Sequence, residues 1–273
     1  MVIATVYALT AAVLHAGWNL IAKRSADPFI ALCTQFTVAG LISGVILVAT
    51  GGLPAEAWLW AGGTGVFHVP YLIGLGWAYR HGEFSLAYPI ARGGGALVAA
   101  IGGLVLLDDD LKVLSLVAIG VVVTGLLMLA AGAPREQVVV ALVVAASIGG
   151  YTLVDSHAAR QFEGTYVFAA FVVIGACAAV AGVASGRAVS VITIGAQAWR
   201  RTIFAASISI VTYGLVLLAV RRAPVGYVAA LRESSVLIAS LVGWRMLGER
   251  SGRTRSVAAG VILVGLVLLV AAR

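Results

Sequence analysis

Residues 118–130 have the sequence AIGVVVTGLLMLA, and residues 258–270, 140 positions later, have the sequence AAGVILVGLVLLV. The two segments share their apolar character and a pair of glycines at the same spacing. The same shift of 140 places Arg92 on Arg232, so a charged residue inside an apolar run is duplicated as well. A shared helix ending and a shared charge at one shift indicate an internal repeat.

The repeat extends to the beginning of each half. At a shift of 133, GWNL at residues 17–20 aligns with GYTL at residues 150–153. We therefore divide the chain into a first repeat at residues 1–133 and a second repeat at residues 134–273.

The composition is that of a membrane protein. Of the 273 residues, 62% are hydrophobic and 11% are charged, whereas about 25% of the residues of a soluble domain are charged. A helix needs about 20 apolar residues to cross a hydrocarbon core about 30 Å thick, and the sequence lacks the alternating segments of a membrane barrel. Ten apolar runs of about this length lie at residues 2–22, 29–50, 58–79, 85–107, 113–131, 138–157, 166–185, 202–220, 225–244 and 256–272. The predicted fold class is therefore an all-α integral membrane protein with ten transmembrane helices.

Ten helices in two repeats place five helices in each repeat, and this odd number determines the topology. The second repeat enters the membrane from the side opposite to the first, so the two repeats are inverted. Inverted repeats are typical of secondary transporters, whose substrate site lies near the middle of the bilayer where the repeats meet. The connections between the runs are short, the longest being residues 186–201, so we expect the function to lie among the helices.

The basic residues of the loops predict the orientation of the chain. The formal net charge is +7, and cytoplasmic loops carry an excess of Lys and Arg. Ten basic residues fall on one side of the predicted topology, namely Lys23, Arg24, Arg80, Arg135, Arg187, Arg200, Arg201, Arg250, Arg253 and Arg255, and five fall on the other, namely Lys112, Arg160, Arg221, Arg222 and Arg273. This distribution predicts that both termini lie outside the cell.

Arg92 and Arg232 lie inside apolar runs, where an arginine costs about 2.5–3.5 kcal/mol at the centre of a helix. Such residues usually face the protein interior and find a partner there. One interpretation is a structural ion pair. The other is an anion clamp, because a guanidinium can bind a carboxylate or phosphonate through two parallel hydrogen bonds. Since Glu233 and Ser234 follow Arg232, we assign the structural role to Arg232 and predict that Arg92 recognises the substrate.

The neighbours of Arg92 predict an interrupted helix. Pro89 lacks a backbone donor and clashes with the carbonyl four residues earlier, and Gly93, Gly94 and Gly95 follow the arginine. We predict a helix break formed by these four residues. Tight helix packing by the glycines is the alternative.

Polar and aromatic residues share single faces of several runs. His15, Trp18 and Asn19 have the i, i+3, i+4 spacing of one helix face, and Tyr151 and Asp155 have the i, i+4 spacing of another. Interhelical packing is the alternative for each such residue taken alone. The predicted substrate-binding residues are Arg92, Arg232, His15, Trp18, Asn19, His68, Tyr71, Tyr88, Tyr151 and Tyr213.

Two acidic residues are candidates for proton coupling, Asp155 and Glu233, because ionisable groups inside a membrane mark proton pathways. Asp155 lies near the end of its run, so the alternative for this residue is interfacial pairing or helix capping.

The motifs together resemble the EamA-type carriers of the drug/metabolite transporter superfamily. The similar segments are LHAGWNLIAKRS at residues 14–25, AYPIARGGGALVAAI at residues 87–101, GGYTLVDSHA at residues 149–158 and ALRESSVLIASLVGWRMLGER at residues 230–250. The resemblance implies ten helices around a central cavity. It also implies cytoplasmic termini, opposite to the orientation that the loop charges predict.

We expect a secondary active transporter that exports a small polar metabolite by alternating access. The cargo would be an amino acid or organic anion with a carboxylate or phosphonate. The alternatives are a flippase for a lipid-linked anionic intermediate and a membrane-embedded lipid-modifying enzyme. The four histidines and two cysteines are scattered, so we expect no metal, no cofactor and no enzyme activity. The expected partners are the substrate and the bilayer, without nucleic acid, for a monomer or weak homodimer in a bacterial-type inner membrane.

Overall fold

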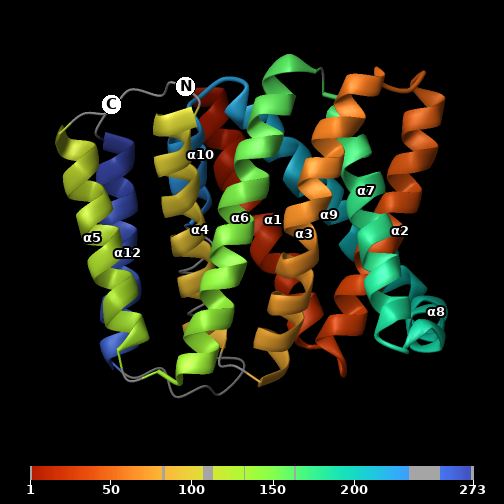
Figure 1. Cartoon of the computed structure of the whole chain (residues 1–273), viewed down its shortest axis with the longest axis horizontal. Helices are drawn as coiled ribbons and strands as arrows, with labels where there is room; N and C mark the ends of the chain where they lie inside the picture. The colour runs from red at the N-terminus through yellow and green to blue at the C-terminus, as the bar shows by residue number, and fades with distance from the viewer. Residues whose placement is uncertain are drawn as a thin grey trace.

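The chain folds into a bundle of helices (Figure 1), seen in a computed structural model that describes residues 2–81, 84–106, 113–131, 133–162, 164–233 and 253–271. All regular structure in these ranges is helical. The helices are α1 (Val2–Lys23), α2 (Pro28–Ala49), α3 (Ala55–His81), α4 (Phe84–Leu106), α5 (Val113–Ala130), α6 (Arg135–Gln161), α7 (Tyr166–Ala184), α8 (Ala188–Gln197), α9 (Trp199–Val220), α10 (Val225–Arg232) and α12 (Arg253–Ala271). The predicted all-helical class is confirmed for the described residues.

Most of the predicted apolar runs coincide with observed helices. The helices α1, α2, α6, α7 and α9 are each long and apolar enough to cross a membrane, so the chain is a multi-pass membrane protein, as its composition predicts. The ninth predicted run, residues 225–244, is described only through α10 and its C-cap Glu233. The number of ten spans therefore stays a prediction.

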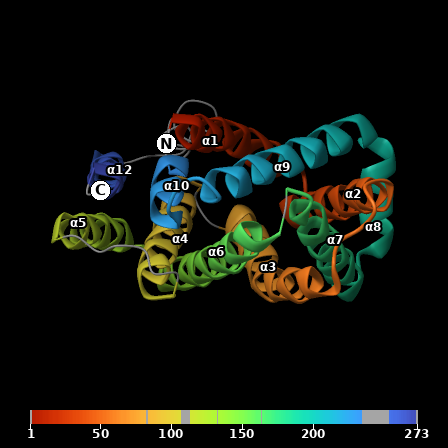
Figure 2. The same ribbon diagram turned by 90° about the horizontal axis from the view of Figure 1, so that it is seen from above.

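The connection between α7 and α9 differs from the prediction, because it contains the helix α8 where a loop was expected. Ten residues extend only about 15 Å at 1.5 Å per residue, so α8 cannot cross a bilayer. It lies across the end of the bundle (Figures 1 and 2), and Val189 and Ile192 are 77% and 72% exposed. A short helix with exposed apolar residues at the end of a membrane bundle is typical of a helix lying in the interface.

Glycines bring α2 and α7 into close contact. A Cβ added to Gly40 would lie 2.9 Å from the Cα of Gly175 and 2.9 Å from the carbonyl oxygen of Phe171. A Cβ added to Gly175 would lie 2.8 Å from the Cα of Gly40 and 2.8 Å from the carbonyl oxygen of Phe36. The contact is reciprocal, and its short distances require a residue without a side chain on both helices.

A second reciprocal contact joins α5 to α12. A Cβ on Gly125 would lie 3.0 Å from the carbonyl oxygen of Ala258, and a Cβ on Gly265 would lie 3.0 Å from the carbonyl oxygen of Ala118. These are two of the residue pairs that the 140-residue shift aligns in the sequence.

Several other helix contacts also come in pairs. The helix α6 packs against α3 and α4, while α1 packs against α9 and α10. Similarly, α3 packs against α7 and α2 against α9, and α4 packs against α5 and α10 against α12. In addition, α4 contacts α10 directly.

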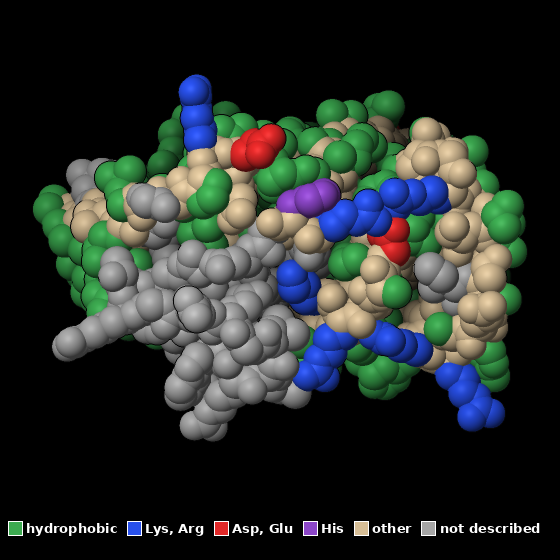
Figure 3. All heavy atoms as spheres, turned by 90° about the horizontal axis from the view of Figure 1, so that it is seen from below, with side chains coloured by type: hydrophobic (Ala, Val, Ile, Leu, Met, Phe, Trp, Pro, Cys, Tyr) green, Lys and Arg blue, Asp and Glu red, His purple; other side chains and the backbone are tan. Residues whose placement is uncertain are grey.

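The two ends of the bundle differ in charge. We call the end where α1 begins and α12 ends the terminal end, and the opposite one the basic end (Figure 1). Lysine and arginine side chains are prominent at the basic end (Figure 3). At the helix ends and connections there, the described basic residues are Lys23, Arg24, Arg80, Arg135, Arg187, Arg200 and Arg201. Arg160, Arg221 and Arg222 lie at the terminal end. The described loop charges are thus distributed as predicted, and the orientation in the membrane stays a prediction.

Candidate functional site

A small enclosed cavity lies at the centre of the bundle. Its lining residues are His15, Trp18, Phe36, His68, Tyr71, Tyr151, Phe171, Ile174, Ser209, Thr212, Tyr213 and Arg232. Every lining residue is 9% exposed or less. Four of the predicted substrate-binding residues, Trp18, Tyr71, Tyr151 and Tyr213, thus line one central cavity. Its volume of about 30 Å³ holds about two water molecules, so side chains must move apart before an organic molecule can enter.

Aromatic rings form most of the cavity wall. His68 stacks on Tyr151 with ring centroids 4.4 Å apart, and Tyr71 meets Tyr151 edge to face at 5.8 Å. Tyr213 continues the wall, with its ring 6.0 Å from that of Tyr151 and 6.1 Å from that of Phe171. Such contacts contribute about 0.5–1.5 kcal/mol each beyond the burial of their area, so this wall is a defined surface.

Arg92 and Glu233 form a buried ion pair between α4 and the C-terminal end of α10. The Nη2 atom of Arg92 lies 2.7 Å from Oε1 of Glu233, and the two side chains are 4% and 3% exposed. Arg232 instead lines the cavity and interacts with the hydroxyl of Tyr151. Consecutive residues of a helix point in different directions at 3.6 residues per turn, so Arg232 and Glu233 meet different partners. The geometry therefore favours the reverse of the predicted assignment, with Arg92 in the structural pair and Arg232 at the cavity.

Positive charges outnumber negative charges in this group of buried charged residues. Two guanidinium groups and one carboxylate leave a net charge of +1 among Arg92, Arg232 and Glu233. His15 is close enough to both arginines to interact with them electrostatically. A buried ion costs several kcal/mol unless an opposite charge compensates it. An anion entering the cavity beside Arg232 would supply that opposite charge.

The predicted helix break at Pro89 and at Gly93, Gly94 and Gly95 is wrong for this structure, because α4 is a continuous helix from Phe84 to Leu106. The glycines are instead packing positions. A Cβ on Gly94 would lie 2.9 Å from the Cβ of Ala145, and one on Gly95 would lie 2.5 Å from the nearest side-chain atom of Ile148. They allow α4 to pack closely against α6, as in the alternative interpretation.

Asp155 on α6 lies in the interior of the protein, so its alternative assignment to interfacial pairing or capping is wrong. Asp155 is 0% exposed. The hydroxyls of Thr64 and Tyr166 donate to Oδ1, the latter at 2.8 Å, and the hydroxyl of Tyr213 donates to Oδ2. We call these four residues the Asp155 cluster. Tyr213 belongs to both the cluster and the cavity wall, so it connects the two.

The other predicted residues have mixed positions. Asn19 is buried and donates to the carbonyl oxygen of His15 at 2.8 Å, and it is not among the lining residues. The side chain of Tyr88 lies outside the described residues. Gln35 was not predicted as a site residue, and its amide donates to the hydroxyl of the lining residue Ser209 at 2.6 Å. A lone glutamine in a strongly apolar run was the signal that could have identified it.

A cluster of charged side chains lies at the basic end, at the start of α2. The carboxylate of Asp27 accepts from Arg80 at the end of α3 and from Arg187 before α8, the latter at 2.6 Å. Asp27 also caps α2 by accepting from the backbone N–H groups of Phe29 and Ile30 at 3.1 and 3.3 Å. One side chain thus joins three segments of the chain.

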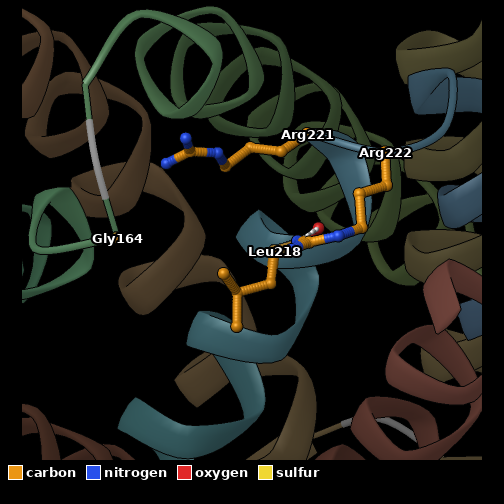
Figure 4. A pocket seen from close by; sticks show the side chains of 4 residues that line it. All are labelled: Gly164, Leu218, Arg221 and Arg222. Carbon is orange, nitrogen blue, oxygen red and sulfur yellow. Dashed lines mark hydrogen bonds between the residues drawn. The ribbon is translucent and has the colours of Figure 1, made fainter.

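A larger open pocket of about 470 Å³ lies at the terminal end, lined by Gly164, Leu218, Arg221 and Arg222 (Figure 4). Arg221 donates to the carbonyl oxygen of Phe162 at 3.1 Å, and Arg222 donates to that of Leu218 at 3.1 Å. Its described lining residues include no acidic or aromatic side chain and it is open to the surroundings, so we regard it as a vestibule and the central cavity as the candidate site.

Fold and site together define a multi-pass helical membrane protein whose central cavity is lined by aromatic rings, hydroxyls and an arginine, and carriers likewise bind their substrates near the centre of the bundle. The family model of the EamA-like transporter family matches residues 136–271, and the chain belongs to this family of the drug/metabolite transporter superfamily. The resemblance derived from the motifs is thereby confirmed.

Solved structures contain the same fold over the whole chain. A crystal structure of a protein with 16% sequence identity superposes with a TM-score of 0.66, covering 97% of this chain and 96% of that one. In total, 22 chains of solved structures match. A search of curated protein sequences gave no match.

Proposed function

We propose that this protein is a secondary active transporter that moves a small polar anion by alternating access through the central cavity. The observation that carries the proposal is the position of Arg232. Its guanidinium belongs to a group of three described residues, Arg92, Arg232 and Glu233, whose charges sum to +1, and it lines a cavity whose other walls are mainly aromatic rings and hydroxyls. This combination suits a carboxylate or phosphonate, since a guanidinium binds either group through two hydrogen bonds.

The helix contacts support two inverted repeats, with α1, α2, α3, α4 and α5 equivalent to α6, α7, α9, α10 and α12. Exchanging equivalent helices turns the contacts of α6 with α3 and α4 into those of α1 with α9 and α10. The pairs α2–α7, α4–α10 and α5–α12 turn into themselves, which is the behaviour of helices beside a two-fold axis. The division at residues 133 and 134 rests on this pattern and on the sequence shifts.

The depth of the charged residues also supports a site between the repeats. Arg92 is eight residues into α4, and Arg232 is seven residues into α10, so each lies about 10–12 Å from the start of its helix at 1.5 Å per residue. The two helices start at opposite ends of the bundle (Figure 1). Both arginines therefore lie near the middle of a bilayer core about 30 Å thick.

The enclosure of the cavity favours a soluble cargo over the alternative functions. All lining residues are 9% exposed or less, whereas a flippase needs a lateral opening for its lipid tail. For an enzyme, the lining offers no acidic side chain among the described residues. We expect a monomer or weak homodimer in a bacterial-type inner membrane. The direction of transport, predicted to be export, stays a prediction.

The test is a ligand screen followed by transport. Purified protein is heated with amino acids, organic acids and phosphonates, because a ligand at 100 times its Kd adds about 2.7 kcal/mol of stability. We expect anions to raise the melting temperature of the wild type. Arg232→Lys should weaken the effect and Arg232→Ala should remove it, while the vestibule variant Arg222→Ala should retain it. Stabilising anions should then enter proteoliposomes. Stabilisation by cations alone, or an undiminished anion effect in Arg232→Ala, would contradict the proposal.

A further inference from the structure

We propose that Asp155 is a proton-binding site, and that a proton on Asp155 releases the Tyr213 hydroxyl to the cargo in the central cavity. The proton site stands on the geometry of the Asp155 cluster, and its link to cargo rests on the proposed anion transport.

The first observation is the environment of the carboxylate. Asp155 is fully buried, and its interactions within the described part of the chain are hydrogen bonds from the hydroxyls of Thr64, Tyr166 and Tyr213. These hydroxyls belong to α3, α7 and α9. They supply dipoles to the carboxylate but no positive charge, so a buried negative charge here has no counter-ion among the described residues. A proton would remove the cost of burying that charge.

The second observation is the contrast with Glu233, the other acidic candidate. Glu233 is equally buried, but its Oε1 atom lies 2.7 Å from a guanidinium nitrogen of Arg92. An ion pair of this kind stabilises the charged carboxylate. The geometry therefore assigns the proton to Asp155 and a permanent negative charge to Glu233.

The surrounding helices contain few other groups that could exchange a proton with Asp155. Tyr166 on α7 and Tyr213 on α9 contact it directly. Tyr151 lies one turn earlier on α6 and interacts with Arg232 of α10, and His68 of α3 stacks on Tyr151. The nearest charged residue on α4 is Arg92, which is paired with Glu233. Among the described residues, Asp155 is thus the acidic group of this region that has no basic partner.

The two carboxylate oxygens have different partners. Oδ1 accepts from both Thr64 and Tyr166, whereas Oδ2 accepts from Tyr213. A proton on Oδ2 converts that oxygen from an acceptor into a donor. The new O–H then donates to the phenolic oxygen of Tyr213, and the Tyr213 O–H must turn to another acceptor. Because the Tyr213 ring lines the cavity, an anion held there by Arg232 is that acceptor.

A chain of contacts connects the Asp155 cluster with the terminal end. Arg221 in the vestibule is bonded to the carbonyl oxygen of Phe162, and the Phe162 ring stacks on Tyr166 with centroids 6.3 Å apart. Tyr166 contacts Asp155, which contacts Tyr213 at the cavity wall. The cluster thus lies between vestibule and cavity. A protonated Asp155 favours a bound anion, so proton and cargo bind together. They then cross the membrane in the same direction. An inward proton gradient would therefore drive uptake of the cargo rather than the predicted export.

Infrared difference spectroscopy tests the proton site without a cargo. On acidification of the purified wild type, we expect the carbonyl-stretching band of a protonated carboxyl group in an apolar environment. Together with it we expect a change in the tyrosine C–O band. The carboxyl band should be absent from Asp155→Asn and present in Asp27→Asn, whose carboxylate lies at the basic end. The tyrosine change should be absent from Tyr213→Phe and present in Tyr227→Phe, whose hydroxyl contacts Thr5 instead.

Tyr213→Phe also tests the proposal if Asp155→Asn does not fold. It keeps the carboxylate but removes the donor to Oδ2, so the carboxyl band should appear at a higher pH than in the wild type. A band that persists in Asp155→Asn, a titration that Tyr213→Phe leaves unchanged, or no such band in the folded wild type would each overturn the proposal. None of these results depends on the cargo, so they are independent of the Arg232 binding test.

Discussion

The different positions of the two central arginines predict unequal losses of stability when each is removed. Arg92→Ala leaves Glu233 buried at 3% side-chain exposure without its 2.7 Å ion-pair partner. Removing one member of a buried pair costs about 3–5 kcal/mol. Arg232→Ala instead removes one of two positive charges near a single carboxylate and leaves the Arg92–Glu233 pair intact. We therefore expect a change of at most about 1 kcal/mol for Arg232→Ala, the size of an ordinary substitution.

Thermal unfolding of the purified variants in detergent measures this difference. One kcal/mol corresponds to about 2–4 °C for a chain of this size, so Arg92→Ala should lower the melting temperature by roughly 6–20 °C. The double variant Arg92→Met with Glu233→Met should recover most of this loss, because apolar residues of similar volume replace a buried pair at little cost. Equal losses for Arg92→Ala and Arg232→Ala, or a double variant no better than Arg92→Ala, would refute the pairing.

Three further predictions concern packing, the basic end and orientation. Gly40→Ala should destabilise the protein by about 1–3 kcal/mol through overpacking against α7. Gly44→Ala should not, because its Cβ would lie 3.7 Å from a side-chain atom of Val172, which is ordinary contact. Equal unfolding temperatures of the two variants would contradict the α2–α7 contact. Asp27→Ala should lower the stability by about 0.5–2 kcal/mol, because it removes the cap of α2. Asp27→Asn keeps a capping oxygen and removes only the charge. It should lower the stability less in the same unfolding assay, since exposed ion pairs contribute little. If both variants lose the same stability, the ion pairs matter more than the cap. A reporter that is active only outside the cell, fused after Arg273, should be active, and activity of a cytoplasmic reporter instead would reverse the predicted orientation.

The sequence predicted those features of the site that depend on one helix at a time. The face of Trp18 followed from its i+3 spacing to His15, and that of Tyr151 from its i+4 spacing to Asp155. Both aromatic residues line the cavity. Long apolar runs likewise predicted the helices, because the bilayer fixes the length of a spanning segment.

Features that depend on several helices could not be predicted in this way. Thr64, Tyr166 and Tyr213 are 91, 11 and 58 residues from Asp155 in sequence, so no local pattern indicates that they meet there. The roles of Arg92 and Arg232 were assigned from the sequence neighbours of Arg232, but a neighbour along a helix points in another direction. The partner of Glu233 comes from α4, which only the packing of the two halves determines.

The difference between the repeats explains how a duplicated charge acquires two roles. The 140-residue shift that aligns Arg92 with Arg232 also aligns Gly93 with Glu233. A carboxylate at position 93 would be crowded, since a Cβ there would lie 3.1 Å from a side-chain atom of Ile262. With one carboxylate for two guanidinium groups, a single pair can form, and it forms across the repeats between Arg92 and Glu233. Two acidic residues would neutralise both arginines and leave a cavity with little attraction for an anion. Because the described residues around the two arginines include no second carboxylate, Arg232 is available at the cavity wall, and we expect Gly93→Glu to abolish anion binding in any variant that still folds.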